Sequence, residues 1–251
     1  MSENTEIAES PSEWQQWLIY VGPLAAYMFV SSFIVSIWER INIQLIASDS
    51  PAVALTVAWA RTFAIAAILI WGGKTLLRRF PFRIHFSSIL FGCIGGILWI
   101  SMCNLNLESK ILTALGFSTE LLGSRQAINP WDFYEEPLSR NLFLVPRLSL
   151  LVIGVPIAEE LFLRGFLLRY LNNGDWSRVK LESLDWTAIP VTAAYGVLTH
   201  PSEWIAAAIW FSMVSVLMLR SRNLWDCIMA HSITNAILGI YILLYQDWRL
   251  W

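Results

Sequence analysis

The sequence predicts an all-α protein, a polytopic transmembrane helix bundle of seven to eight spans. The 251 residues are 56% hydrophobic and 14% charged, whereas a globular domain is about 25% charged. The apolar residues form blocks of roughly 17 to 25, the length that crosses about 30 Å of hydrocarbon. Fourteen Trp residues, many at block ends, fit the aromatic belts of a membrane–water interface. A lipid bilayer is therefore the expected environment.

Seven apolar blocks can be assigned as spans in chain order, at 17–38, 52–71, 86–103, 143–168, 186–200, 203–219 and 224–245. Each is expected to be helical, because backbone polar groups in lipid must be satisfied within the segment or by a closed barrel. The blocks are long and continuously apolar, without the short alternating pattern of a membrane β-barrel.

The segment between the third and fourth spans is rich in charged residues and contains Asn129-Pro130. This composition predicts an extramembrane loop with one interfacial helix near 111–122. The chain then divides into four parts: an acidic tail at 1–16, a three-helix membrane part at 17–103, this loop at 104–140 and a second helix bundle at 141–251.

Basic residues gather in three connections that seven spans place on the same side as the N-terminus. They are Lys74, Arg78, Arg79, Arg83, Arg169, Arg178, Lys180, Arg220 and Arg222, against Arg40, Lys110, Arg125, Arg140 and Arg249 on the other side. The positive-inside rule makes the richer side cytoplasmic. We therefore expect a multi-pass membrane protein with a cytoplasmic N-terminus.

Composition also excludes some classes of partner and site. The sequence contains no basic tract of the kind that binds a nucleic acid. The acidic N-terminal segment, which contains Glu3, Glu6, Glu9 and Glu13, is expected to be a solvated tail. The three cysteines, Cys93, Cys103 and Cys227, form no CxxC pair. Neither a disulfide framework nor a structural zinc site is indicated.

The fourth span holds the densest set of ionisable side chains, in Ala158-Glu159-Glu160-Leu161-Phe162-Leu163-Arg164. Such residues inside a span are costly and are functional candidates by default. Glu160 and Arg164 are four residues apart, on one face, in the favourable acid-before-base order. That pair can neutralise itself, which leaves Glu159 as the carboxylate available for chemistry.

Two of the three histidines fall in or at the end of a span. His200 closes the fifth block, and His231 lies two turns into the seventh with Asn235 on the same face one turn later. A glutamate and imidazoles that converge from separate helices can activate a water and stabilise an oxyanion. The third histidine, His85, is expected to be solvated in a basic connection.

In this order, Glu159-Glu160-x-x-x-Arg164, His200 and His231-x-x-x-Asn235 resemble the three motifs of the CPBP family of intramembrane proteases, which includes the type II CAAX prenyl endopeptidase. The stretch from Leu224 to Asn235 is especially similar to the third motif. The ending Asp247-Trp248-Arg249-Leu250-Trp251 and the pair Glu203-Trp204 resemble the bacterial branch associated with exosortase systems. The resemblance covers residues from about 143 onward.

The resemblance implies an intramembrane endopeptidase whose catalytic helix bundle is 141–251. Glu159, aided by His200, would activate water, and His231 and Asn235 would bind the oxyanion, while Glu160 and Arg164 would brace the fourth helix. Its substrate would be a membrane-anchored peptide or protein, with a link to an exosortase system. No cofactor is expected. A His₂Glu zinc set of Glu159, His200 and His231 is a less favoured alternative.

The second motif departs from the family pattern, which is usually Phe-x-x-x-His. Here Gly196 stands four residues before His200, and Tyr195 stands five before. An upright helix from 186 to 200 would also put His200 at a different depth from His231. We therefore predict a short or irregular helix around Gly196–Pro201 that brings His200 level with His231.

Two functions from other classes remain as alternatives. One is a membrane interaction or immunity protein of the same fold without essential proteolysis. The other is a proton-coupled transporter that uses Glu159, Glu160 and the histidines as a relay. A transporter would usually show an internal repeat or broken helices in two matching halves, and the sequence shows neither.

The remaining charges near the spans receive structural interpretations. Arg61 and Arg147 are expected to stabilise the bundle or to snorkel, with a contact to a substrate carboxylate as the alternative for either. Asp226 and Glu203 lie near span ends and are expected to be hydrated.

Overall fold

The structure is a computed structural model that describes residues 11–41, 50–122 and 128–250. Glu3, Glu6, Glu9 and Arg125, to which the sequence assigns places in the tail and the loop, lie outside the described residues, and so does the side chain of Arg40. All regular structure in the described part is helical, as predicted.

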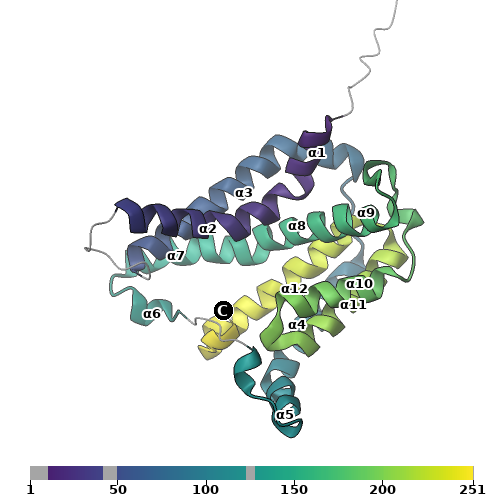
Figure 1. Cartoon of the computed structure of the whole chain (residues 1–251). Helices are drawn as coiled ribbons and strands as arrows, with labels where there is room; N and C mark the ends of the chain where they lie inside the picture. The colour runs from purple at the N-terminus through teal and green to yellow at the C-terminus, as the bar shows by residue number, and fades with distance from the viewer. Residues whose placement is uncertain (1–10, 42–49, 123–127, 251) are drawn as a thin grey trace, which may run out of the picture.

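The long helices form two groups that run side by side (Figure 1). The first group holds α1 (Glu13–Tyr20), α2 (Gly22–Ile41), α3 (Pro51–Arg79) and a continuous helix made of α7 (Pro137–Ser149), α8 (Val155–Glu160) and α9 (Leu168–Asn172). The second group holds α4 (Phe86–Leu105), α10 (Ala188–Thr199), α11 (Trp204–Ser221) and α12 (Leu224–Tyr245). The two groups meet where α12 packs on α8.

Among the described residues, five helices are long and apolar enough to cross a membrane, and the count is six if the bent pair α1–α2 is one span. These two helices meet at an angle of 65°. Multiple long apolar helices make this a multi-pass membrane protein, and the bounds of α12 coincide with the predicted seventh span.

The fifth predicted span, 186–200, is the main difference from the predicted count of seven to eight. It forms only the 12-residue helix α10, which at 1.5 Å per residue is about 18 Å long and too short to cross about 30 Å of hydrocarbon. His200 leaves the helix at φ −131° and ψ 63°, and a 3₁₀ turn at Pro201–Glu203 follows. The helix before His200 is short, as predicted, whereas the depth of His200 relative to His231 stays a prediction.

The segment 104–140 contains more helix than the sequence predicts. Asn106 takes a left-handed conformation, and α5 (Leu107–Ala114) continues directly from α4. Shorter turns follow at Thr119–Leu122, and a one-turn helix, α6, spans Pro130–Phe133. The helix predicted near 111–122 therefore starts earlier, where the buried Glu108 carboxylate accepts a hydrogen bond from the Ile205 backbone at the start of α11.

The continuous helix 137–172 is not uniformly α-helical. Two π-helical segments, Leu150–Gly154 and Leu161–Leu167, lie on either side of α8. A π segment inserts one residue into the helical repeat and is frequent at functional sites. The two insertions enclose Glu159 and Glu160, so they set the direction in which these side chains point.

Glycines on α4 allow this helix to approach α12 closely. A Cβ at Gly92 would lie 2.7 Å from the Ile233 side chain and 2.8 Å from the Ala230 carbonyl oxygen, and one at Gly95 would meet Thr234 at 2.7 Å. Small residues at helix interfaces in membranes allow such contact. The Thr234 hydroxyl donates to the Gly92 carbonyl at 3.0 Å across the interface.

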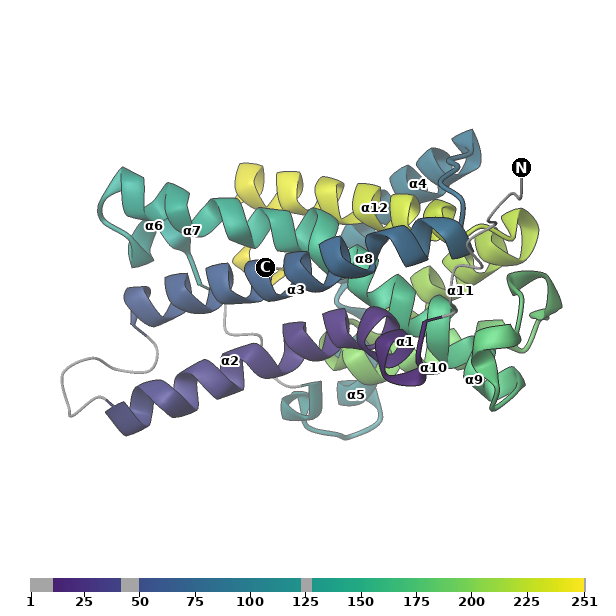
Figure 2. The same cartoon turned by 90° about the horizontal axis from the view of Figure 1, so that it is seen from above.

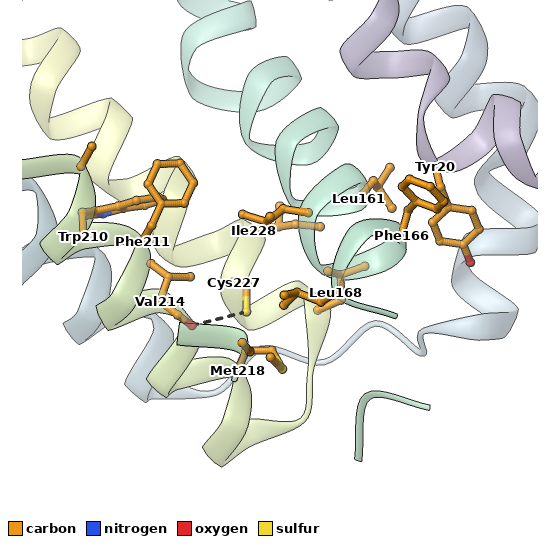
Figure 3. Packing of buried hydrophobic residues seen from close by; sticks show 14 of the residues in the cluster. Tyr20, Leu161, Phe166, Leu168, Trp210, Phe211, Val214, Met218, Cys227 and Ile228 are labelled. Atoms are coloured by element: carbon orange, nitrogen blue, oxygen red, sulfur yellow. Dashed lines mark hydrogen bonds between the residues drawn. The ribbon is translucent and has the colours of Figure 1, made fainter. Parts of the chain in front are cut away.

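Apolar side chains fill the space between α11, α12 and the helix that carries Glu159 and Glu160. Figure 3 shows Val214 and Met218 of α11 beside Cys227 and Ile228 of α12, and Leu161 beside Tyr20 and Phe166. Trp210 and Phe211 continue this surface along α11. The core therefore fixes the relative positions of three helices that carry candidate site residues.

Figure 2 shows the bundle turned by 90°, with the ends of α9, α10 and α11 gathered at one end. There His85, predicted to be solvated, is half exposed and binds Asp226 through Nδ1 at 2.7 Å and through its backbone N–H at 2.8 Å. The predictions of hydration for Asp226 and Glu203 are wrong, because both are buried. Asp226 instead joins the α3–α4 connection to α12.

Substituting Gly92 tests the α4–α12 contact. We expect Gly92→Ala to lower the free energy of unfolding by about 1–3 kcal/mol, because the added methyl group meets a backbone carbonyl that cannot move aside. Gly73→Ala on α3, where nothing lies within 4 Å, is the matched control and should be neutral or slightly stabilising. Thermal melts in detergent would contradict the packing if both variants behaved alike.

Candidate active site

A cavity of about 550 Å³ opens inside the bundle and is lined by Glu159, His200, His231 and Asn235. These residues come from α8, the end of α10 and α12. The walls around them are largely apolar, and among their residues are Leu24 and Met28 of α2 and Leu198 of α10. The structure thus brings the four predicted site residues to one cavity.

His231 lies between the two glutamates of α8. Its Nδ1 is 3.1 Å from Glu160 Oε1, and its Nε2 is 3.7 Å from Glu159 Oε2. The Glu160 carboxylate is an acceptor that also binds Arg164, so Nδ1 must be the donor to it. The opposite ring nitrogen, Nε2, then faces Glu159 in the cavity. Sequence reasoning did not anticipate this contact, because it assigned Glu160 to Arg164 alone.

The predicted pairing of Glu160 with Arg164 is confirmed, and both side chains are fully buried. Arg164 also donates at 3.3 Å to the Phe211 carbonyl and to the Ser215 hydroxyl. Ser215 in turn hydrogen-bonds to Thr192 of α10 at 2.7 Å. A chain of polar contacts therefore joins α12, α8, α11 and α10. These contacts fix the relative positions of the helices that carry the site residues.

Asn235 owes its position to Pro156. In the π segment the Val155 N–H donates to the carbonyl of Leu150, five residues earlier. With the same spacing, a backbone N–H at position 156 would donate to the Leu151 carbonyl. Proline has no N–H, and the Asn235 amide donates to the Leu151 carbonyl instead, at 2.8 Å. An amide carries two N–H donors, so the second is left for another acceptor.

His200 lies against aromatic rings at the end of α10. Its ring is 5.4 Å from Trp99 and 5.9 Å from Phe211, and its Nδ1 is 2.9 Å from the Thr199 hydroxyl. Trp99 is 6.3 Å from Trp210, which stands edge-on to His231 at 4.5 Å. Two tryptophan rings therefore separate the two histidines along one wall of the cavity.

The departure at Gly196 has a structural explanation. A Cβ at Gly196 would lie 2.4 Å from the Phe211 ring. Phe211 of α11 thus occupies the space beside α10 that a side chain at position 196 would need, and its ring also contacts His200 and Tyr195. The aromatic ring next to position 196 therefore comes from the neighbouring helix.

Several cavity residues were missed or misjudged from the sequence. Tyr195 lines the same cavity as Glu159, and its ring contacts Phe162 and Phe211. Trp99 and Trp210 also line the cavity, and both are buried. Arg147 lines the cavity, whereas Arg61 stabilises the bundle as expected, through the Ser31 hydroxyl and the Tyr27 ring.

The chain after α12 turns back toward the cavity. Gln246 has a left-handed conformation (φ 54°), and Asp247 and Arg249 are joined by two hydrogen bonds of 2.7 Å. The Arg249 side chain thereby holds the pKa of the Asp247 carboxyl below its usual range. Leu250 is buried at the end of this turn and lines the cavity.

The zinc alternative does not fit this geometry. Within residues 11–41, 50–122 and 128–250, no three His, Cys, Asp or Glu side chains are grouped closely enough to hold a metal ion. The Nδ1 of His231 is already committed to Glu160. Glu159, His200 and His231 therefore line one cavity without forming a ligand set.

Comparison with known families agrees with this location. Residues 141–237 match the family model described as type II CAAX prenyl endopeptidase Rce1-like. The matched stretch, less than half of the chain, contains Glu159, Glu160, Arg164, His200, His231 and Asn235. The match suggests an intramembrane protease that acts on proteins or peptides. No curated protein and no solved structure matches the chain.

The two glutamates should respond differently to neutralisation. We expect Glu160→Gln to destabilise the protein by about 3 kcal/mol or more, because it leaves the Arg164 charge unpaired inside the bundle. The isosteric control Glu159→Gln, which removes no buried ion pair with an arginine, should cost roughly 1 kcal/mol or less. Melting curves in detergent with the reverse order would mean that the two roles are exchanged.

The role of Pro156 can be tested by a double-mutant cycle. Asn235→Ala alone should cost about 1–3 kcal/mol, because it leaves the Leu151 carbonyl without a donor. Pro156→Ala supplies a backbone N–H, so Asn235→Ala should cost less in that background. We expect a coupling energy above about 0.5 kcal/mol from unfolding measurements. Strict additivity would refute the link between Pro156 and Asn235.

Proposed function

We propose that this protein is an intramembrane endopeptidase that hydrolyses a peptide bond of a membrane-associated peptide or protein. The observation that carries the proposal is the convergence of Glu159, His200, His231 and Asn235 on one cavity among apolar helices. The match of residues 141–237 to a CAAX endopeptidase family supports the same reaction class.

In the proposed reaction, Glu159 accepts a proton from a water that attacks the carbonyl carbon of the scissile bond. The gap of 3.7 Å between Glu159 and His231 is wider than a hydrogen bond, and His200 faces the same cavity. In the proposed mechanism His200 helps Glu159 to hold and position this water for attack. Glu159 then returns the proton to the nitrogen of the leaving amine.

The carbonyl oxygen becomes negatively charged when water adds. Asn235 has one amide N–H that is not used by Leu151, and His231 can donate from Nε2 when that atom carries a proton. Both groups are preorganised, because Glu160 fixes the His231 ring and Leu151 fixes the Asn235 amide. Fixed donors of this kind stabilise a developing oxyanion. Glu160 and Arg164 act as positioning residues.

The proposal extends to location and partners. Three basic connections lie together at one end of the bundle, which supports a cytoplasmic N-terminus by the positive-inside rule, and we assign the chain to a bacterial inner membrane. The ending of the chain and the Glu203-Trp204 pair support a substrate handled by an exosortase system. The apolar cavity wall suits an anchored, apolar substrate segment.

The alternative functions make different use of the same residues. A membrane interaction or immunity protein would keep the fold without needing Glu159, whereas a transporter would need a continuous polar path. Next to the cavity, Arg164 forms buried contacts with Glu160 and Ser215. This arrangement favours a reaction centre over a relay through the bundle.

Neutralising Glu159 tests the reaction directly. We expect Glu159→Gln to reduce proteolysis by about 10²- to 10⁴-fold, the usual contribution of a general base. The readout is the set of new N-termini in membranes that contain the wild type, labelled and identified by mass spectrometry. Glu108→Gln, a buried glutamate outside the cavity, is the matched control. Identical termini for the wild type and Glu159→Gln would favour a non-proteolytic role.

Metal removal tests the proposed chemistry in a second way. The cleavage rate should change by less than about twofold after dialysis against a strong zinc chelator, because the cavity offers no grouped set of metal ligands among the described residues. A loss of activity that added zinc restores would contradict the metal-free mechanism.

A further inference from the structure

A second cavity, about 490 Å³ in volume, lies at the end of the bundle where the basic connections meet. Its walls come from the α3–α4 connection, the segment between α9 and α10, and the turn between α11 and α12. Four cationic side chains line it, Arg79, Arg83, Lys180 and Arg222, with Glu182 as the single carboxylate apart from the His85 contact to Asp226. This basic pocket is separate from the cavity that holds Glu159.

Two of the four cations are fixed by main-chain carbonyl groups. Arg222 donates to Leu181 and Leu184 at 2.9 and 2.6 Å, and Arg79 donates to Ser177 and Val179 at 2.9 and 3.1 Å. Carbonyl groups position a guanidinium without cancelling its charge. These two arginines are therefore preorganised cations.

The other two cations, Arg83 and Lys180, are exposed, and their side chains have no hydrogen-bond or ion-pair partner among the described residues. The one available carboxylate, that of Glu182, is exposed and forms no ion pair with them in the described part of the chain. The Ser221 hydroxyl of this pocket is buried and lacks a hydrogen-bond partner there. The pocket thus holds an excess of positive charge and an unused donor.

The depth of the pocket indicates where its ligand comes from. Helix α3 ends at Arg79, α4 begins at Phe86, α11 ends at Ser221 and α12 begins at Leu224. The walls from the α3–α4 and α11–α12 connections therefore lie at span ends, which is the level of lipid headgroups. Phe82 and Phe86 stand beside the basic residues and are 60% and 77% exposed. An apolar rim next to a cationic pocket suits a ligand with a negative head and an acyl tail.

We propose that this basic pocket binds the phosphate headgroup of an anionic phospholipid. Arginine binds phosphate oxygens through paired N–H donors, and basic pockets between membrane helices bind such headgroups. The fixed Arg79 and Arg222 bind the phosphate, Arg83 and Lys180 add charge at the mouth, and the acyl chains pack along Phe82 and Phe86. This lipid would join three connections of the chain. The proposal does not depend on the protease function.

The test uses the purified full chain in neutral detergent, titrated with short-chain phosphatidylglycerol or phosphatidylcholine while the melting midpoint is followed. Phosphatidylglycerol should raise the midpoint and phosphatidylcholine should not. Inorganic phosphate at the same concentration is the second arm. An equal rise with inorganic phosphate would overturn the assignment to a lipid, because the pocket would then bind a free anion.

The variant Arg83→Gln with Lys180→Gln removes the two partner-free cations without removing a contact within the described protein. Each basic residue near an anionic surface is worth about a fivefold change in affinity, so the pair should weaken phosphatidylglycerol binding about 25-fold. Lys110→Gln, an exposed lysine on α5 outside this pocket, is the matched control and should leave affinity unchanged. Unchanged affinity in the double variant, or an equal loss in the control, would overturn the site.

Discussion

The guanidinium of Arg164 is enclosed by the bundle, and its charge must be neutralised where water cannot reach it. Glu160 supplies the opposite charge from one turn earlier, and the Phe211 carbonyl and Ser215 hydroxyl take further N–H groups. The same carboxylate accepts from His231. One ion pair therefore fixes the relative positions of α8, α11 and α12 and determines which ring nitrogen of His231 faces Glu159. Removing one partner of a buried pair is strongly destabilising, so this arrangement has little freedom.

The irregular backbone of the helix 137–172 contributes the second constraint. Two π segments flank the pair Glu159-Glu160, and Pro156 removes the donor that the Leu151 carbonyl would receive in the π register. Asn235 supplies that donor from α12. The N–H that is missing from one helix is thus replaced by a side-chain amide of another helix. As a result, an amide group is held in the cavity at a defined place.

Much of the fold follows from the sequence, because long apolar blocks and membrane thickness leave few choices. The bounds of α12 and the end of α10 before His200 could be predicted in this way. Other features depend on contacts between distant residues that one sequence does not encode locally. Phe211 fills the space beside Gly196 from another helix, and Trp99 of α4 lines the cavity. Asp226 is buried and accepts hydrogen bonds from His85 in the α3–α4 connection. Hydropathy alone also counted α10 as a full span, although its 12 residues are too few.

The protonation of His231 tests this account most directly. The chain has three histidines, so ¹⁵N-histidine labelling together with His85→Gln and His200→Gln variants isolates the resonances of His231. The account predicts a protonated Nδ1 that is hydrogen-bonded to a carboxylate, with a signal that shifts when Glu160, but not Glu108, is replaced by Gln. A neutral ring protonated only at Nε2, or a signal insensitive to Glu160→Gln, would contradict the proposed arrangement of the site.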